Sequence, residues 1–232
     1  MTLPIKYIHK MSLIDYPPYA VSTLFLGGCN FRCPYCHNKD LVLNPEQMDN
    51  LEEAEVLGYL ALRKKWIDGI CVTGGEPLLN DLTAFLSRVR HLGLQVKLDT
   101  NGAFPDLLER LVHEGLVDFI AMDIKAPPAK YQAVTGSRIE VSQVAASVAC
   151  IRVSGLPHEF RTTLVPDMLD DEDFREIGIW LRGADQFSLQ QFRPHDCLDR
   201  HLATQLPWLP QKVEEIQRMM SAYISNVAIK GI

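Results

Sequence analysis

Short apolar segments alternate with amphipathic stretches along most of the chain, and this alternation restricts the fold more than any other feature. The segments that we expect to form buried strands span residues 21–26, 69–73, 96–99, 119–124, 159–165 and 187–192. Patterns and caps typical of helices follow them, over residues 50–66, 80–91, 105–115, 142–152, 171–182 and 209–224. Six such units with near-continuous apolar strands predict an α/β fold around a parallel sheet. The alternation alone leaves both an open doubly wound sheet and a barrel possible.

The length and composition indicate one globular domain. The 232 residues can bury a sizeable core, and 47% of them are apolar. The sequence contains no internal repeat, low-complexity tract or obvious linker, so we expect a single domain over residues 1–232. Residues 1–20 contain three prolines and no sustained period, which predicts an N-terminal strap with a short hairpin.

Charge and hydropathy exclude several classes of partner. The net charge of -6 argues against nucleic-acid binding, because phosphate contacts need clustered Lys and Arg. The dense basic run Arg63-Lys64-Lys65 is typical of a solvated helix end. No apolar run reaches the roughly eighteen residues of a membrane span, and the N-terminus lacks the apolar segment of a signal peptide. We therefore expect a cytoplasmic protein without nucleic-acid or membrane partners.

Three cysteines follow the first expected strand. Cys29, Cys33 and Cys36 lie in residues 27–38, where glycine, asparagine and proline favour a loop over a helix. Three neighbouring thiolates indicate a metal centre. A 4Fe-4S cluster held by three cysteines would leave one iron open for a ligand. The alternatives are a zinc site completed by His37 and a redox pair formed by the last two cysteines.

Polar residues follow several strands at the points where these strands end, and parallel α/β folds bind their ligands at this edge. They are Gly74-Gly75-Glu76, Asp99-Thr100-Asn101, and Asp123 with Lys125. Two glycines permit a close backbone approach to a ligand. Acidic residues at neighbouring strand ends need a cation between them, which could be the lysine or a bound metal ion. The alternatives are a plain tight turn, an exposed turn and a surface ion pair.

Arg161 stands inside an apolar strand, where a charge needs a partner or a cavity. An outward-facing arginine at a strand edge is the alternative. The isolated Cys71 and Cys150 have apolar neighbours, and we assign them to the core.

The cysteine motif, with Tyr35 before its last cysteine, resembles the signature of the radical S-adenosylmethionine (radical SAM) superfamily. The following His37-Asn38 and the segment 12–17 resemble glycyl-radical-enzyme activating enzymes. The resemblance implies a partial (β/α)6 TIM-like barrel with residues 27–38 as its cluster-binding loop. It further implies that SAM chelates the open iron through its amino and carboxylate groups. Reductive cleavage would give methionine and a 5'-deoxyadenosyl radical, which would abstract hydrogen from a glycine α-carbon of a partner protein.

The same resemblance assigns roles to individual residues. Cys29, Cys33 and Cys36 would hold the catalytic 4Fe-4S cluster. The residues that would bind SAM are Tyr35, Gly74, Gly75, Glu76, Asp99, Asn101, Asp123, Lys125 and Arg161. A monovalent cation would lie among Asp99, Thr100, the Ala121 carbonyl and Asp123.

The end of the last predicted strand is harder to interpret. Gln191 and Arg193 could face the adenine or ribose of SAM. The spacing of His195, Cys197 and His201 fits no standard pair of metal ligands, so we expect a surface loop there.

Among activating enzymes, the chain is most similar to anaerobic ribonucleoside-triphosphate reductase activating proteins. This likeness implies an oxidoreductase of anaerobic metabolism whose partners are a glycyl radical enzyme and a flavodoxin or ferredoxin-type electron donor. The alternatives are a pyruvate formate-lyase-type activating enzyme, a radical SAM enzyme acting on a small molecule such as a deazapurine precursor, and a non-catalytic metal-binding interaction protein.

Overall fold

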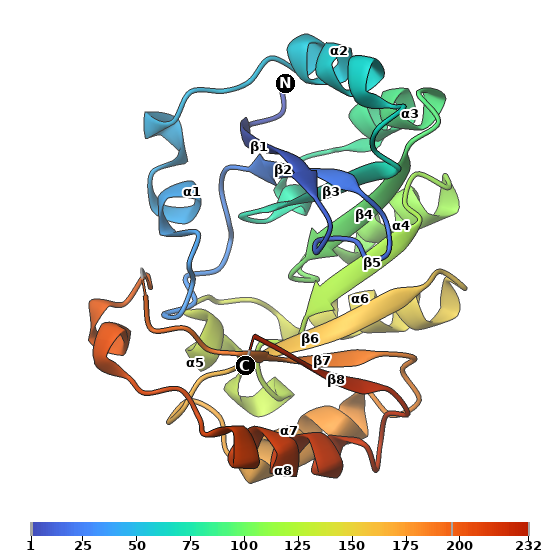
Figure 1. The fold of residues 1–232 in the computed structure, drawn as a ribbon. Helices are drawn as coiled ribbons and strands as arrows, with labels where there is room; N and C mark the ends of the chain where they lie inside the picture. Colours follow the sequence, from blue (N-terminus) through green and yellow to red (C-terminus); the bar gives the residue numbers. More distant parts are fainter. Residues whose placement is uncertain (1, 196, 232) are drawn as a thin grey trace.

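One sheet of eight strands, in sequence order from β1 to β8, forms the centre of the protein (Figure 1). A computed structural model describes residues 2–195 and 197–231. The strands are β1 Ile5–Ser12, β2 Val21–Leu26, β3 Gly69–Gly74, β4 Gln95–Thr100, β5 Phe119–Asp123, β6 His158–Leu164, β7 Phe187–Gln191 and β8 Val227–Lys230. β1 is antiparallel to β2, and every later neighbour is parallel. In the described chain β1 and β8 are not paired, so the barrel is partial, as expected.

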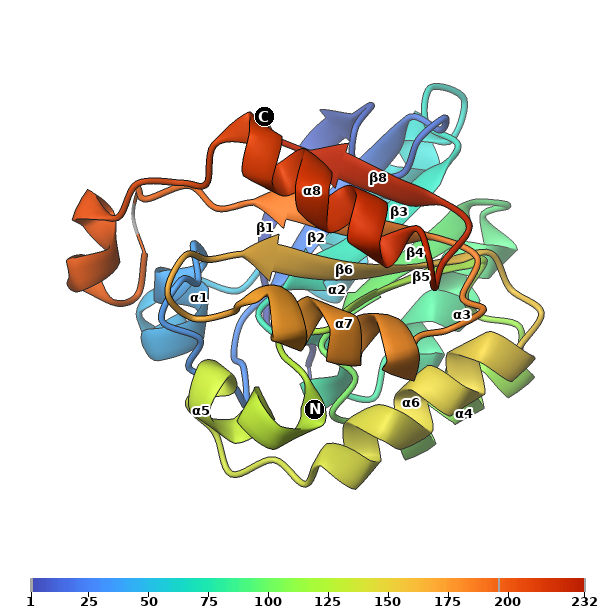
Figure 2. The same ribbon diagram turned by 90° about the horizontal axis from the view of Figure 1, so that it is seen from below.

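Helices connect the parallel strands and cover the outer side of the sheet (Figure 2). They are α1 Lys39–Leu43, α2 Glu53–Arg63, α3 Thr83–His91, α4 Pro105–His113, α5 Tyr131–Thr135, α6 Val141–Val153, α7 Asp171–Trp180 and α8 Pro210–Met220. Their starts follow local rules: Asp170 and Asp173 form a capping box before α7, and proline occupies the first turn of α4 and α8. Within the described chain, no helix is long and apolar enough to cross a membrane.

Strand alternation separates an apolar outer face from a polar inner face. Val72, Leu98 and Ile120 are register partners on successive strands, and all three are fully buried in the core under the helices. The intervening residues point to the opposite side, because side chains alternate along a strand. Lys97, Asp99, Asp123, Arg161 and Ser188 therefore share the inner face. This inner face leads to the carboxyl ends of the parallel strands.

The structure differs from the predicted elements at both ends of the chain and in one helix. Residues 5–12 of the expected strap form β1, a full strand of the sheet. Residues 227–230 form β8, which the sequence analysis did not predict. The expected helix over residues 50–66 is shorter, because α2 begins at Glu53 and ends at Arg63. The six predicted strands and their parallel pairing are confirmed.

Candidate functional site: a cysteine loop facing the strand ends

The segment that carries the three cysteines is irregular and leads from β2 to α1 (Figure 1). Cys33 is buried, whereas Cys29 and Cys36 are half-buried. All three line one cavity of about 250 Å³ at the carboxyl ends of the strands. The six cysteines of the chain are all described, and none forms a disulfide.

The loop after β3 holds the cysteine loop by backbone contacts. The Glu76 amide donates to the Gly28 carbonyl at 2.8 Å, and the Asn38 side-chain amide donates to the Gly74 carbonyl at 2.8 Å. A Cβ atom at Gly75 would lie 1.9 Å from the Gly28 oxygen. Glycine is therefore needed at position 75 because two backbone segments meet closely there, whereas the sequence predicted a close approach to a ligand.

A second clamp comes from the loop after β7. The amides of Leu198 and Asp199 donate to the carbonyls of Cys36 and Pro34, at 3.0 and 2.8 Å. The His37 ring lies 2.8 Å from the Arg193 carbonyl through Nε2. The cysteine loop is thus held between the β3 end and the C-terminal part of the chain.

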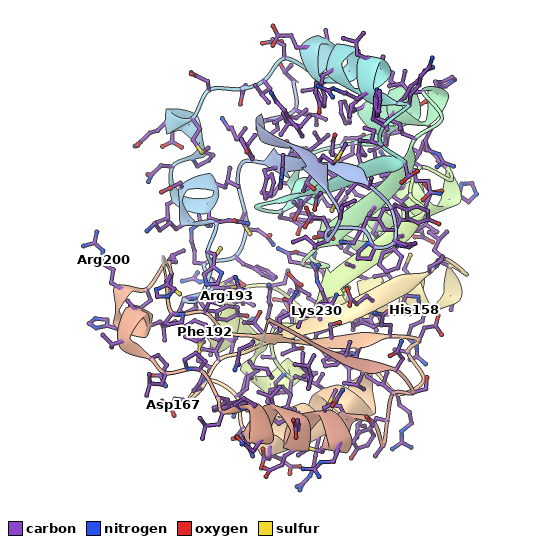
Figure 3. All side chains as sticks on the ribbon, in the orientation of Figure 1. His158, Asp167, Phe192, Arg193, Arg200 and Lys230 are labelled. Carbon is purple, nitrogen blue, oxygen red and sulfur yellow. The ribbon has the colours of Figure 1, made fainter. Side chains whose placement is uncertain are left out.

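The expectation of a surface loop after β7 is wrong for Cys197, which is only 4% exposed. His195 and His201 are exposed, as predicted. Arg200 points away from the rest of the molecule in Figure 3. Burial of the thiol follows from the clamp, which draws this loop against the cysteine loop.

Charged side chains form the wall opposite the cysteines. Arg161 contacts two carboxylates: its Nε lies 2.8 Å from Asp123 Oδ1 and its Nη1 lies 3.2 Å from Asp99 Oδ2. The Lys125 ammonium lies 2.9 Å from Asp123 Oδ2, and Lys97 lies 2.6 Å from Asp99 Oδ1. Burial favours the neutral carboxyl of Asp123, but Arg161 and Lys125 keep its pKa below the ordinary value. Burial likewise opposes the charge on Lys125, yet Asp123 keeps its pKa well above the ordinary value.

Glu76 lies behind the cavity wall and is fully buried. Its carboxylate accepts hydrogen bonds from the Leu78 amide at 3.0 Å, the Asn101 amide at 2.7 Å and the Thr100 hydroxyl at 2.8 Å. Burial nevertheless raises the pKa of Glu76 to about 7. This carboxyl joins the ends of β3 and β4. The Asn101 side chain then contacts the cysteine loop at Asn30 Oδ1, 2.8 Å away.

The thiols suit a cluster better than a single metal ion. In residues 2–195 and 197–231, no three His, Cys, Asp or Glu side chains converge on a point where one ion could bind. Burial raises the pKa of Cys29 to about 12 and that of Cys33 to about 11, so binding of a metal centre would release protons. Three thiols that line one cavity fit a 4Fe-4S cluster with one open iron.

Tyr35 contributes a hydroxyl group to the region of the cavity. Its ring is buried, with the Lys125 ammonium 5.9 Å from the ring centre. Its hydroxyl is buried and has no hydrogen-bond partner in the described residues. A buried hydroxyl beside a ligand cavity indicates a group that a ligand could satisfy.

Comparison with known families decides the identity of this arrangement. The family model described as the radical SAM superfamily matches residues 23–180, from β2 to the end of α7. This chain belongs to the radical SAM superfamily.

Two curated relatives of this radical SAM chain carry activase names. A glycyl-radical enzyme activating enzyme of Methanocaldococcus jannaschii is 33% identical over 97% of this chain and 95% of its own length. A pyruvate formate-lyase-activating enzyme of Streptococcus mutans is 30% identical over 80% of this chain and 73% of its own length.

Solved structures share the radical SAM fold at low sequence identity. SuiB of Streptococcus suis bound to S-adenosylmethionine matches 88% of this chain with a TM-score of 0.68 and 13% identity. This chain spans about half the length of SuiB, covering 48% of it. QueE of Escherichia coli matches 82% of this chain and 83% of its own, with a TM-score of 0.54 and 15% identity. These similarities concern the fold.

The radical SAM cavity brings together most of the residues singled out from the sequence. Those that line it are Cys29, Cys33, Tyr35, Cys36, Gly74, Gly75, Asp99, Thr100, Asn101, Asp123, Lys125 and Arg161. Glu76, Ala121, Gln191 and Arg193 are not among the described lining residues. The Gln191 side chain instead donates to the Trp208 carbonyl at 2.6 Å. Cys71 is buried as predicted, in a small cluster with Tyr16 and Val21. Cys150 is half-buried and packs against the main hydrophobic core.

Sequence reasoning missed four polar residues of this region. Thr73, Thr163 and Gln190 line the cavity, and Lys97 lies behind Asp99. Counting two residues on from Arg161 along β6 would have found Thr163. The rule that singled out Arg161, a charge within an apolar strand, applies equally to Lys97.

Proposed function

We propose that this radical SAM enzyme is an activase that generates a glycyl radical on a partner enzyme, with anaerobic ribonucleoside-triphosphate reductase as the first candidate partner. The convergence of the three-cysteine loop with Lys125 and Arg161 on one cavity is the observation that carries the proposal. The activase names of the relatives, one of which matches nearly the whole chain, support the choice of a protein substrate.

Cys29, Cys33 and Cys36 would hold the 4Fe-4S cluster, which when bound supplies the electron for reductive cleavage of SAM. Lys125 donates to Asp123, and Arg161 donates to Asp99 and Asp123. Each cation has further N–H groups, which would be available to the SAM carboxylate. Gly74 and Gly75, which have no side chains, line the same cavity. The unpaired hydroxyl of Tyr35 is a further contact in this scheme.

Glu76 has a supporting role in this scheme. Its carboxylate is occupied by three donors of the chain, and it would position Thr100 and Asn101 at the cavity wall.

A monovalent cation between Asp99 and Asp123 stays a prediction. It would share both carboxylates with Lys97, Arg161 and Lys125. If such an ion belongs to the site, replacing alkali cations in the buffer by tetramethylammonium should weaken SAM binding. Unchanged SAM affinity would contradict the predicted cation site.

A pyruvate formate-lyase-type activase is the second candidate, favoured by the similarity to the Streptococcus mutans enzyme. Either activity needs a one-electron donor, for which a flavodoxin or a ferredoxin-type protein is the proposed class. The two candidates differ in the partner that accepts the radical, so the experiment must offer both partners.

The test begins without a partner. Protein reconstituted anaerobically with iron and sulfide is reduced and mixed with SAM, and 5'-deoxyadenosine is quantified against a Cys29→Ala control. We expect product that depends on the cysteine. Each candidate partner is then added, and a glycyl radical is sought by electron paramagnetic resonance. Absence of product from fully cluster-loaded protein, with and without both partners, would contradict the proposal.

A further inference from the structure

Lys97 is a buried lysine that the proposed chemistry does not use. It lies in the middle of β4 and is 5% exposed. It is not among the described residues that line the cavity. A buried ammonium is costly unless it is paired, so its partners indicate why the position holds a lysine.

Its partners place Lys97 at the inner end of a chain of alternating charges. Lys97 Nζ lies 2.6 Å from Asp99 Oδ1, and Asp99 Oδ2 accepts from Arg161. Arg161 reaches Asp123, and Asp123 reaches Lys125. We call these five residues the ion chain. Four of them line the cavity, and Lys97 is the member behind its wall.

The ion chain holds three cations and two carboxylates, which leaves one positive charge in excess. The nearby buried Glu159 is paired with Lys230 of β8 at 2.5 Å, and Lys230 is outside the ion chain. Glu76 is outside the ion chain, because its carboxyl accepts from the Leu78 amide, the Asn101 amide and the Thr100 hydroxyl. An ion chain with one positive charge in excess suits a ligand group with one negative charge.

Removal of the Lys97 ammonium would change the position of the Arg161 guanidinium. Asp99 Oδ1 would lose its partner at 2.6 Å and become a half-buried carboxylate oxygen without that donor. The nearest mobile cation is the guanidinium of Arg161, which already contacts the other oxygen of Asp99. Without Lys97, the guanidinium would be drawn toward Asp99 and away from a ligand.

We infer that Lys97 is a positioning residue that supplies the excess positive charge of the ion chain and so sets the affinity of the site for a ligand carboxylate that it never touches. The inference rests on the proposed function, in which that carboxylate belongs to SAM. Cys71, whose sulfur lies 3.8 Å from Lys97 Nζ, is a neighbour outside the ion chain and offers a matched control.

The experiment measures equilibrium binding of SAM and of decarboxylated SAM to cluster-loaded protein. Lys97→Met should weaken SAM binding about tenfold, which is typical of coupling between groups that do not touch, and should leave decarboxylated SAM unaffected. Lys97→Arg and Cys71→Ser should bind both ligands as the unaltered protein does. Equal losses for both ligands, or no loss for either, would overturn the inference.

A double variant separates charge from packing. Lys97→Met with Asp99→Asn removes one charge of each sign, which restores the excess positive charge of the ion chain. It should bind SAM more tightly than Lys97→Met alone, and it stays informative if the single variant folds poorly. Failure of this rescue would refute the role of Lys97. If the unaltered cluster-loaded protein did not bind SAM, the proposed function would fail first and the inference with it.

Discussion

Gly75→Ala tests directly how the radical SAM cavity is assembled. The added methyl carbon would lie 1.9 Å from the Gly28 oxygen and 2.7 Å from its carbonyl carbon. Both are backbone atoms, which cannot swing aside as the end of a long side chain can. Gly75 is a cleaner choice than Gly74, whose φ of +116° would add backbone strain to any substitution.

The size of the effect follows from two costs. Forcing a methyl group into a packed contact costs about 1–3 kcal/mol. Separating the two loops also breaks the bond from the Glu76 amide to the Gly28 carbonyl, and an unpaired buried group costs about 1–3 kcal/mol. We expect the free energy of unfolding to fall by roughly 3 kcal/mol, because partial relaxation keeps the total below the sum of the two costs.

Urea unfolding of the protein without its cluster measures the free energy, and iron content after reconstitution reports on the cysteine loop. The matched control is Gly58→Ala in α2, where an added Cβ atom meets no atom within 4 Å. That change should stabilise the protein by up to about 1 kcal/mol through helix propensity and leave iron content unaltered. An unfolding free energy and an iron content of Gly75→Ala equal to those of the unaltered protein would refute the argument that the two loops need this glycine.

Three further changes address the cluster, the ion chain and a buried acid. Cys33→Ala should abolish cluster binding, and a variant that kept its full iron content and SAM cleavage would contradict the assignment of this thiol. Asp123→Ala should weaken SAM binding while iron content stays normal, because the carboxylate holds both Arg161 and Lys125; an unchanged dissociation constant would argue against this role. Since burial raises the pKa of Glu76 from 4.5 to about 7, the stability that its proton contributes is present below pH 4.5 and is lost as the pH rises through about 7. Urea unfolding between about pH 5 and about pH 8 should show a decline of at most roughly 3 kcal/mol from this group that Glu76→Gln lacks, and equal slopes in both proteins would contradict it.

The features that could be predicted from the sequence depend on residues that are close together in the chain or on the general geometry of parallel sheets. The parallel strands follow from apolar segments between helix signals, because each segment carries its own burial pattern. The three thiols line one cavity because they share one short loop. Asp99, Asp123 and Lys125 meet there because the carboxyl ends of parallel strands lie at one edge of the sheet.

Contacts between distant segments explain the predictions that failed. Residues 227–230 form a short strand whose pairing with β7 is its main support, so its local pattern gives a weak signal. Cys197 is buried because the amides of its neighbours Leu198 and Asp199 bind the cysteine loop. Nothing within residues 193–205 indicates that contact.

Local propensity and period specified the order of the six predicted strands and their helices, the loop that carries the thiols and the strand ends that face it. The contacts by which Glu76 supports the wall instead of lining it, and by which Lys97 completes the ion chain, became visible in the folded protein alone. A side chain's partner depends on sheet register and on the approach of remote loops, and neither is encoded by the residues next to it.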